Sequence, residues 1–361
     1  MYKDLKSILK ILSDECLLVE IRNPLNINLD KYIVSGTIKT DTRTIRIGDI
    51  FSCIKGFNVD GHDFSAEALA KGASILIVES KQFIDVTQIV VTDSKKATAI
   101  ISKYIYDNPS EKFHLIGVTG TNGKTTTTFI LDQLYQQKGH KTGLIGTLGY
   151  KIGDKFYESD RTTPDIVQLN EIFYKMAEAG CTVVIMEVSS HALTLGRVFG
   201  IKFNVGIFTN LTQDHLDFHK DMIEYGEAKY LLFKMVQENN GVCIINTDDE
   251  FGKTIYNRIS GTKISYSMNH ADWVISDIKT CSVNTEFKLQ NDDKLINIIS
   301  PLVGKFNVYN LTAAIVACRS GELRAGRKQA HGHHLRNASD AHRELALVRS
   351  GRRPAHLRVQ Q

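Results

Sequence analysis

The stretch Gly117-Val-Thr-Gly-Thr-Asn-Gly-Lys-Thr-Thr-Thr-Thr128 decides the fold of the central part of this chain. It follows the apolar run 113–116, which is typical of a buried strand, and it precedes residues 129–138, whose apolar side chains recur with helical periodicity. A strand, a glycine-rich turn, Lys-Thr and a helix form the arrangement that cradles the phosphates of a nucleoside triphosphate. The sequence therefore predicts an ATP-using enzyme.

Each residue type in this turn suits one task. Glycines let backbone N–H groups approach phosphate oxygens, Lys124 supplies a point charge between the β- and γ-phosphates, and the Thr125 hydroxyl can bind Mg²⁺. The turn departs from the general pattern because Val118 stands where that pattern has its first glycine. A chance Gly-Lys-Thr is the alternative, and the flanking strand and helix weigh against it. The predicted nucleotide-binding residues are Gly120, Thr121, Asn122, Gly123, Lys124, Thr125 and Thr126.

Length and composition indicate a globular protein of more than one domain. The chain has 361 residues, of which 42% are hydrophobic and 23% charged. No apolar run is long enough to span a bilayer, and lysines interrupt the N-terminal segment, unlike a signal peptide. The six cysteines are scattered without a CxxC pair, which indicates reduced thiols. We expect a cytoplasmic monomer that acts on small molecules and binds neither nucleic acid nor membrane.

The composition changes abruptly near Cys318. Residues 319–361 contain nine arginines and no Ile, Phe, Tyr or Trp, and their net charge is +7 although the whole chain carries only +4. A segment with few large apolar residues and a high net charge cannot bury enough surface to offset its conformational entropy. We therefore expect a disordered tail that arose from a frameshift or a foreign junction. A genuine basic extension that binds anionic partners is the alternative.

The remaining sequence predicts an α/β fold in two units. The first unit, with strands at 72–79 and 88–92, ends at Asn108-Pro109. Residues 110–318 alternate apolar runs with helical patterns, which is typical of a mostly parallel sheet with helices on both faces. The strands expected there are 113–116, 142–146, 182–186, 205–208 and 242–245, with shorter strands at 263–267, 273–278 and 285–289 in an antiparallel edge. The expected helices are 166–179, 222–237 and 307–317.

Two polar motifs follow predicted strands of the second unit. Glu187 comes directly after the strand 182–186, at the sheet edge where ligands bind in open α/β folds. A carboxylate there can bind the Mg²⁺ of a nucleotide. His215 follows the strand 205–208 and is a candidate second metal ligand, although a lone histidine is more often structural. Lys229 lies on the predicted helix 222–237, where composition alone gives no reason to select it.

The order of these motifs resembles the Mur ligases, and among them the MurE type, which adds the third residue of the peptidoglycan stem peptide. The resemblance covers residues 1–318. It rests on Thr-Gly-Thr-Asn-Gly-Lys-Thr (119–125), Arg-Thr-Thr-Pro-Asp (161–165), Met-Glu-Val-Ser-Ser-His-Ala-Leu (186–193), Thr-Asn-Leu-Thr-Gln-Asp-His-Leu-Asp-Phe-His (209–219), Gly-Glu-Ala-Lys (226–229), Gly-Lys-Phe-Asn-Val-Tyr-Asn (304–310), Asp41-Thr-Arg43 and Asp60-Gly-His62.

The resemblance implies a role for each matching position. It implies catalysis by Lys124, Glu187, His215 and Lys229. Lys229 matches the lysine that is carbamylated in the family, and its carbamate would join Thr125, Glu187 and His215 around Mg²⁺. On the uridine side, the implied substrate-binding residues are Thr42, which replaces a family serine, and Phe57, Asn58 and Val59. The implied residues for the muramoyl-peptide are Thr162, Thr163, Ser189 and Arg197. Asn307 and Asn310 would meet the adenine.

The resemblance also implies domains and a reaction. It implies a UDP-MurNAc-binding domain (1–109) and an ATP-binding domain (110–318), followed in the family by a third, Rossmann-like domain that residues after Cys318 do not resemble. The implied reaction joins meso-diaminopimelate or L-lysine to UDP-MurNAc-L-Ala-D-Glu through an acyl phosphate, with ATP and Mg²⁺, in peptidoglycan synthesis. Two alternatives stay open: a related ligase of the MurF or folylpolyglutamate type, and a non-catalytic fragment that only binds nucleotide and UDP-sugar peptide.

Overall fold

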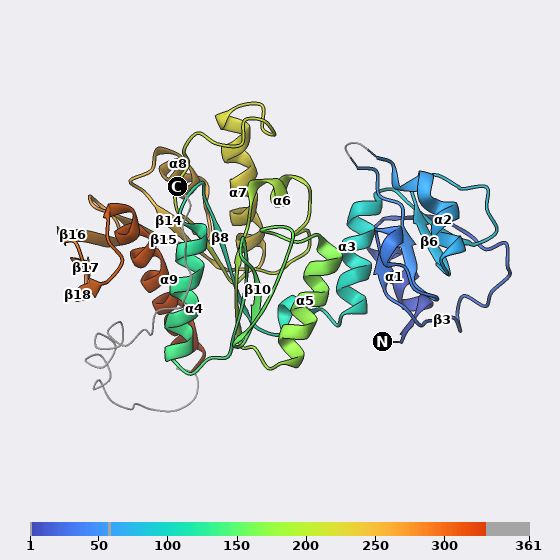
Figure 1. Cartoon of the computed structure of the whole chain (residues 1–361), viewed down its shortest axis with the longest axis horizontal. Coiled ribbons are helices and arrows are strands. Elements are labelled where there is room, and N and C mark those ends of the chain that lie inside the picture. The colour runs from blue at the N-terminus through green and yellow to red at the C-terminus, as the bar shows by residue number, and fades with distance from the viewer. Residues whose placement is uncertain (1, 57–58, 330–361) are drawn as a thin grey trace.

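The computed structural model describes residues 2–56 and 59–329, and its N-terminal unit lies beside the larger central sheet (Figure 1). The elements of this unit are β1 (Lys3–Asp4), α1 (Leu5–Asp14), β2 (Leu18–Arg22), β3 (Ile33–Val34), β4 (Ile38–Lys39), η1 (Thr42–Thr44), β5 (Ile50–Ser52), η2 (Gly61–Phe64), α2 (Ser65–Ala70), β6 (Ile75–Val78), β7 (Thr87–Val91), α3 (Ser94–Ile105) and η3 (Pro109–Glu111). Five strands form a sheet in the order β2-β7-β6-β5-β4, parallel except for β2.

The central sheet has eleven strands in the order β11-β10-β9-β12-β8-β13-β14-β15-β16-β17-β18. These strands are β8 (His114–Thr119), β9 (Thr142–Gly146), β10 (Gly149–Ile152), β11 (Lys155–Tyr157), β12 (Val183–Glu187), β13 (Val205–Phe208), β14 (Val242–Asn246), β15 (Thr262–Ser267), β16 (Trp273–Thr280), β17 (Thr285–Asn291) and β18 (Lys294–Ser300). Its helices are α4 (Lys124–Gln137), α5 (Ile166–Glu178), α6 (Ser190–Thr194), α7 (Met222–Glu238), α8 (Glu250–Arg258) and α9 (Lys305–Gln329). Neighbours from β9 to β16 are parallel, and the strands beyond them at both edges are antiparallel.

The predicted α/β class and its mostly parallel sheet are confirmed, and three details differ. β15 pairs in parallel with both neighbours, so the antiparallel edge begins at β17 and not at residue 263. The hairpin β10–β11 was not predicted, although its two-residue Gly153-Asp154 turn is a recognised hairpin signal. The strand β18 was not predicted either.

The helix α9 crosses the boundary that the change of composition predicted at residue 318. It runs to Gln329: residues 319–329 contain no proline and include the helix formers Glu, Leu, Ala, Arg, Lys and Gln, with Gly321 and Gly326 among them. The expectation of a disordered tail is therefore wrong for residues 319–329. Residues 330–361 lie outside the described part of the chain, and for them it stays a prediction. The domain boundaries at 109 and 318 also remain proposals.

Alternation along the strands sorts apolar side chains into two cores, one on each face of the central sheet. In β12, Val183 and Ile185 join the cluster that includes residues of α4 and α9, which lie side by side in Figure 1. Val184 and Met186 join the cluster on the opposite face, with residues of α5 and α7. A parallel sheet covered on both faces explains why these strands read as continuous apolar runs.

The second of these cores continues into the N-terminal unit. The same cluster contains Leu5 of α1 and Phe173 of α5, and the helices α3 and α5 pack against each other (Figure 1). At this contact Asn170 Nδ2 donates a hydrogen bond to Ser102 Oγ at 3.1 Å. The two units are thus joined by shared packing. Within the described residues no helix combines the length and apolar character that crossing a bilayer requires.

Gly117 in β8 provides a test of the central packing. A methyl group added there would lie 2.8 Å from Cε1 of the fully buried Phe203 ring. We expect Gly117→Ala to destabilise the protein by about 1–3 kcal/mol, measured as a lower midpoint of urea unfolding. Gly261→Ala is the matched control, because its nearest neighbour would be 3.4 Å away. Equal midpoints for the two variants would contradict this account of the packing.

Candidate functional site

The glycine-rich turn 120–123 connects β8 to α4 at the edge where the parallel strands end. Gly123, at φ 86°, precedes the first residue of α4, and no side chain caps this helix start. The first N–H groups of a helix have no partner within the helix, so this end of α4 can receive phosphate oxygens. Gly120, at φ 148°, permits a close approach, because a Cβ atom there would lie 1.9 Å from Thr209 Oγ1.

The segment that follows β13 holds this turn in place. Asn210 accepts from the Asn122 N–H through its side chain (2.9 Å) and from the Thr121 N–H through its carbonyl (2.9 Å). Thr209 Oγ1 donates to the Asn122 carbonyl at 2.6 Å, and the Thr212 N–H donates to Thr121 Oγ1 at 3.0 Å. The shape of the turn is therefore fixed by residues about 90 positions later in the sequence.

Lys124 folds back over the turn. Its Nζ donates to the carbonyls of Gly120 and Thr121, both at 2.9 Å. Burial lowers the pKa of this ammonium, and the carboxylates of Glu187 and Asp214 oppose that shift. A partly desolvated cation whose partners are neutral carbonyls can exchange them for phosphate oxygens.

Glu187 is fully buried at the end of β12 and is held by two threonines. Its Oε1 accepts from Thr125 Oγ1 at 2.9 Å and from the Thr147 N–H at 3.0 Å, and its Oε2 accepts from Thr147 Oγ1 at 3.2 Å. Two of the predicted Mg²⁺ ligands, Thr125 and Glu187, are thus in direct contact.

Lys229 lies on α7 with only 1% of its surface exposed. Its Nζ sits 4.1 Å from the centre of the Tyr225 ring, and it makes no hydrogen bond or ion pair with any residue that the structure describes. The pKa of Lys229 is lowered to about 6, chiefly by burial and also by the nearby Lys124, while Asp214 opposes the shift. Near neutral pH this lysine is a neutral amine, which is its nucleophilic form.

His215 lies in the segment between β13 and α7, with its backbone in the left-handed region at φ 54°. Its ring lies 4.9 Å from that of His191 and 5.8 Å from that of Tyr225, between centres. The Tyr225 hydroxyl lies 3.1 Å from Thr121 Oγ1 of the glycine-rich turn. His215 therefore reaches the turn through Tyr225, and among the described contacts none joins it directly to Glu187 or Thr125.

The donor set at this edge fits magnesium better than a metal that needs an all-protein cage. Among the described residues no group of three His, Cys, Asp or Glu side chains could hold a metal ion. Mg²⁺ commonly keeps several waters and takes one or two carboxylates together with substrate phosphates. The contact between Glu187 and Thr125 matches that need, because it offers a carboxylate and a hydroxyl beside the phosphate-binding turn.

The four residues predicted to hold the muramoyl-peptide lie next to Glu187. Thr163 Oγ1 donates to the Glu187 carbonyl at 2.9 Å and accepts from the Ser189 N–H at 3.2 Å. Arg197 Nη1 donates to the Thr163 carbonyl at 3.4 Å. The hydroxyl of Thr162 lies 3.2 Å from that of Thr147, which itself binds Glu187. We call the set Thr162, Thr163, Ser189 and Arg197 the substrate ledge.

The predicted adenine-binding residues also contact the glycine-rich turn. Asn310 Oδ1 accepts from Thr127 Oγ1 at 3.4 Å, and a Cβ atom at Gly123 would lie 2.3 Å from the same oxygen. Asn310 Nδ2 donates to Asn307 Oδ1 at 3.3 Å. The start of α9 therefore lies against the start of α4.

The predicted uridine-side residues lie in the N-terminal unit. Thr42 is buried in η1 and donates to Glu67 Oε1 at 2.8 Å, whereas Val59 is exposed. Phe57 and Asn58 lie outside the described residues. No described hydrogen bond links Thr42 to the glycine-rich turn or to the substrate ledge, so its role stays a prediction.

Three contacts of the site were not predicted. They are the contact of the Tyr225 ring with Lys229, the hydrogen bonds of Thr147 to Glu187, and the hydrogen bonds of the segment from Thr209 to Thr212 with the glycine-rich turn. Tyr225 could have been found, because it lies four residues before Lys229 and therefore on the same face of a helix. The other two depend on contacts between distant strands, which no local pattern signals.

Known protein families match most of the chain. Residues 36–110 match the Mur ligase family, catalytic domain, and residues 118–318 match the Mur ligase middle domain. The chain is 42% identical over 287 residues to a UDP-N-acetylmuramoyl-L-alanyl-D-glutamate–2,6-diaminopimelate ligase of Bacillus cereus. This match covers 78% of this chain and 58% of that protein. It is 44% identical over 303 residues to the ligase of the same name from Clostridium perfringens, and this match covers 80% of this chain and 62% of that protein.

A solved structure of a UDP-N-acetylmuramoyl-L-alanyl-D-glutamate–2,6-diaminopimelate ligase superposes with a TM-score of 0.75 at 26% identity, covering 89% of this chain and 64% of that one. The chain thus spans about 58–62% of the length of these two curated relatives. The family match, the sequence identity and the fold agree, and the chain belongs to the Mur ligase family.

Proposed function

We propose that this chain carries the UDP-sugar and ATP sites of an ATP-dependent ligase that joins 2,6-diaminopimelate to UDP-MurNAc-L-Ala-D-Glu. The observation that carries the proposal is the contact between the phosphate-binding edge and the substrate ledge, because Glu187 bonds to Thr125 on one side and to Thr163 on the other. The names of the curated relatives support diaminopimelate over lysine. We also propose that the protein acts as a cytoplasmic monomer.

In the proposed reaction, the ledge holds the side-chain carboxylate of D-Glu in line with the γ-phosphate of ATP. The carboxylate oxygen forms a bond to phosphorus and ADP leaves, which gives an acyl phosphate. The amine of diaminopimelate then adds to the acyl carbon, loses a proton, and inorganic phosphate leaves. Lys124 would move from the carbonyls of Gly120 and Thr121 to the phosphate oxygens, where its charge opposes the negative charge that develops.

Thr125 and Glu187 would hold Mg²⁺, which neutralises phosphate charge when it is bound. We propose His215 and the carbamate of Lys229 as further ligands. Asn307 and Asn310 would meet the adenine, and Thr42, Phe57, Asn58 and Val59 would line the uridine site. These assignments rest on the family resemblance and on the contacts of α9 with the glycine-rich turn.

The surroundings of Lys229 favour carbamylation on physical grounds. A neutral amine can attack CO₂, and burial keeps Lys229 neutral near pH 7. The nearby Lys124 disfavours an ammonium at this position, and for the same reason it stabilises an anionic carbamate. Carbamylation would therefore turn a repulsive pair of lysines into an attractive one.

The proposed function is tested by incubating the protein with ATP, Mg²⁺, UDP-MurNAc-L-Ala-D-Glu and meso-diaminopimelate. Mass spectrometry should detect the UDP-MurNAc-tripeptide, and replacement of diaminopimelate by L-lysine should give far less product. Binding of ATP and of the UDP-sugar dipeptide without any tripeptide would favour the alternative of a binding-only protein. Binding of neither would contradict both functions.

We expect Lys124→Ala to weaken ATP binding and to slow phosphoryl transfer by about 10²–10³-fold, because a charged donor to the phosphates is lost. Isothermal titration calorimetry and ADP release measure the two effects. The fold should survive, since Lys124 binds only carbonyls of its own turn. Lys10→Ala on α1 is the control. Unchanged ATP affinity and phosphoryl transfer in Lys124→Ala would refute the assignment of the turn.

We expect Lys229 to form a carbamate in bicarbonate buffer. With ¹³C-labelled bicarbonate, ¹³C NMR should show a carbamate resonance that disappears in Lys229→Met and persists in Lys234→Met, an exposed lysine on the same helix. This readout does not depend on catalysis. A wild-type protein without the resonance, or a Lys229→Met variant that keeps it, would overturn the assignment.

Lys229 should also make stability depend on pH. Its pKa is about 6 in the folded protein, whereas the unfolded chain has the ordinary lysine pKa of 10.5, so between these values the unfolded chain binds the extra proton. The contribution of Lys229 to the free energy of unfolding must then rise with pH across this window. In CO₂-free buffer, Lys229→Met should raise the urea midpoint more at pH 7 than at pH 10. An equal gain at both pH values would contradict the depressed pKa.

A further inference from the structure

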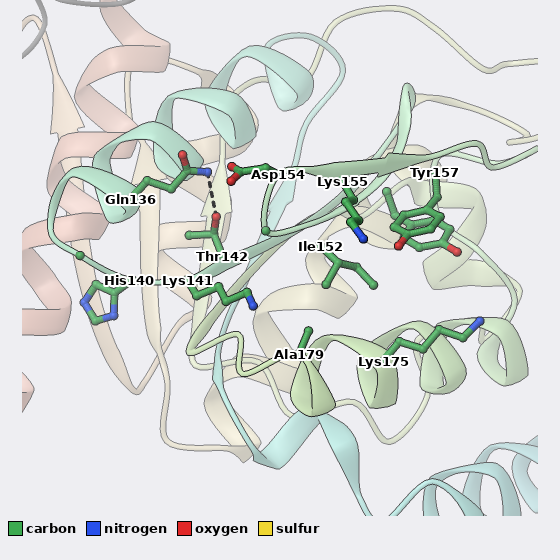
Figure 2. Close-up of a pocket in the computed structure, with 13 residues that line it drawn as sticks. Gln136, His140, Lys141, Thr142, Ile152, Asp154, Lys155, Tyr157, Lys175 and Ala179 are labelled. Atoms are coloured by element: carbon green, nitrogen blue, oxygen red, sulfur yellow. Dashed lines mark hydrogen bonds between the residues drawn. The ribbon is translucent and has the colours of Figure 1, made fainter.

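A pocket of about 890 Å³ opens at the opposite edge of the central sheet, where the parallel strands begin (Figure 2). We call it the hairpin pocket, because the hairpin β10–β11 forms one wall. Its other walls are the end of α4 with the loop that enters β9, and the end of α5. Helix α4 has 14 residues and is therefore about 21 Å long, which separates this pocket from the phosphate-binding turn at the other end of the helix.

The hairpin pocket is rich in cations. Lys141, Lys155 and Lys175 line it from three different elements, and His140 stands beside them, whereas Asp154 is the acidic residue of the lining. Lys175 pairs with Glu171 at 2.7 Å. Lys141 and Lys155 form no ion pair with any residue that the structure describes, and Figure 2 shows both side chains directed toward Ile152 from different sides of the pocket. Two unpaired ammonium groups therefore face one space.

One carboxylate of α4 contacts the lining residues Gln136 and Thr142 and is already bound. Asp132 of α4 forms an ion pair with the buried Lys151 and accepts from Thr142 Oγ1 at 2.6 Å and from Gln136 Nε2 at 3.0 Å. Because Asp132 is bound to these three groups, it does not neutralise Lys141 or Lys155. The lining has one carboxylate, Asp154, and two lysines without an ion pair among the described residues, Lys141 and Lys155, so a net positive charge remains for a ligand from outside the chain.

The positions of the cations are set by structure that does not depend on them. Residues Ile152 and Lys155 pair across a two-residue turn, with Gly153 at φ 57°, so Lys155 leaves the hairpin at a fixed register. The Lys151–Asp132 pair ties β10 to α4 behind the pocket. The rings of Tyr150 and Tyr157 stack at 4.9 Å between centres and 9° between planes, which adds two phenol groups to the wall.

We propose that the hairpin pocket binds a small molecule that carries two or more linked phosphate groups. Lysines act as point charges toward phosphate, whereas recognition of a planar carboxylate commonly uses the two-pronged guanidinium of arginine, and the lining contains no arginine. The volume lies within the range of sites for small organic ligands. The site lies apart from the ATP edge, so it goes beyond the proposed ligase activity and stands independently of it.

The test uses Lys124→Ala protein, in which the phosphate-binding turn is disabled. Isothermal titration calorimetry with inorganic tripolyphosphate should show one saturable site that weakens as salt rises. Adding Lys141→Ala and Lys155→Ala should weaken the affinity at least tenfold. Adding Lys10→Ala and Lys294→Ala, which remove the same charge from exposed positions elsewhere, should change it less than twofold. The double variant Lys141→Arg and Lys155→Arg keeps both positive charges and should therefore retain most of the affinity that the double alanine variant loses. It controls for structural damage at the two positions.

A second arm compares tripolyphosphate with ADP in the same Lys124→Ala protein. Tighter binding of ADP, lost with Lys141 and Lys155, would assign a nucleotide to the site, and equal binding would assign the phosphate chain alone; both results uphold the proposal. No saturable binding of either probe would overturn it. Binding that survives Lys141→Ala and Lys155→Ala as well as it survives the control pair would also overturn it.

Discussion

The glycine-rich turn at the edge of the central sheet depends on close contacts with two polar side chains that only glycine permits. At Gly120 and Gly123 a Cβ atom would lie 1.9 Å from Thr209 Oγ1 and 2.3 Å from Asn310 Oδ1. The turn is therefore packed between the segment after β13 and the start of α9. The turn is thereby held at the start of α4, where the first N–H groups of the helix can receive phosphate oxygens.

The same edge carries charges that a purely structural core would avoid. Glu187 is fully buried, and Lys229 is buried without an anionic partner among the described residues. Burying an ionisable group without a counter-charge costs free energy unless the group neutralises, as Lys229 does. Perturbed groups of this kind gather at functional sites, because the chemistry needs protonation states that water would not give. A nucleotide would bring negative charge to Lys124 and a metal ion positive charge to Glu187, and reaction of the neutral Lys229 amine with CO₂, with loss of a proton, would create an anionic carbamate.

The sequence was sufficient for the elements with strong local signals. The glycine-rich turn, Glu187 at a strand end and the helix carrying Lys229 follow from periodicity and from motif order. It was insufficient where tertiary contacts decide. Thr147 binds Glu187 across the sheet, and Tyr225 reaches Thr121 over 104 positions. The high net charge and the lack of Ile and aromatic residues after residue 318 suggested an end of folded structure, yet α9 continues to Gln329.

We propose that the contact between Thr125 and Glu187 forms the metal-binding edge of a nucleotide site. The most direct test of this proposal is the Mg²⁺ dependence of ATP affinity, measured by calorimetry for the wild type and for Glu187→Gln, which keeps the size of the side chain and removes its charge. We expect Mg²⁺ to tighten ATP binding at least tenfold in the wild type and to have little effect in Glu187→Gln. Without Mg²⁺, the two proteins should bind ATP with similar affinity. An equal Mg²⁺ effect in both proteins would contradict it.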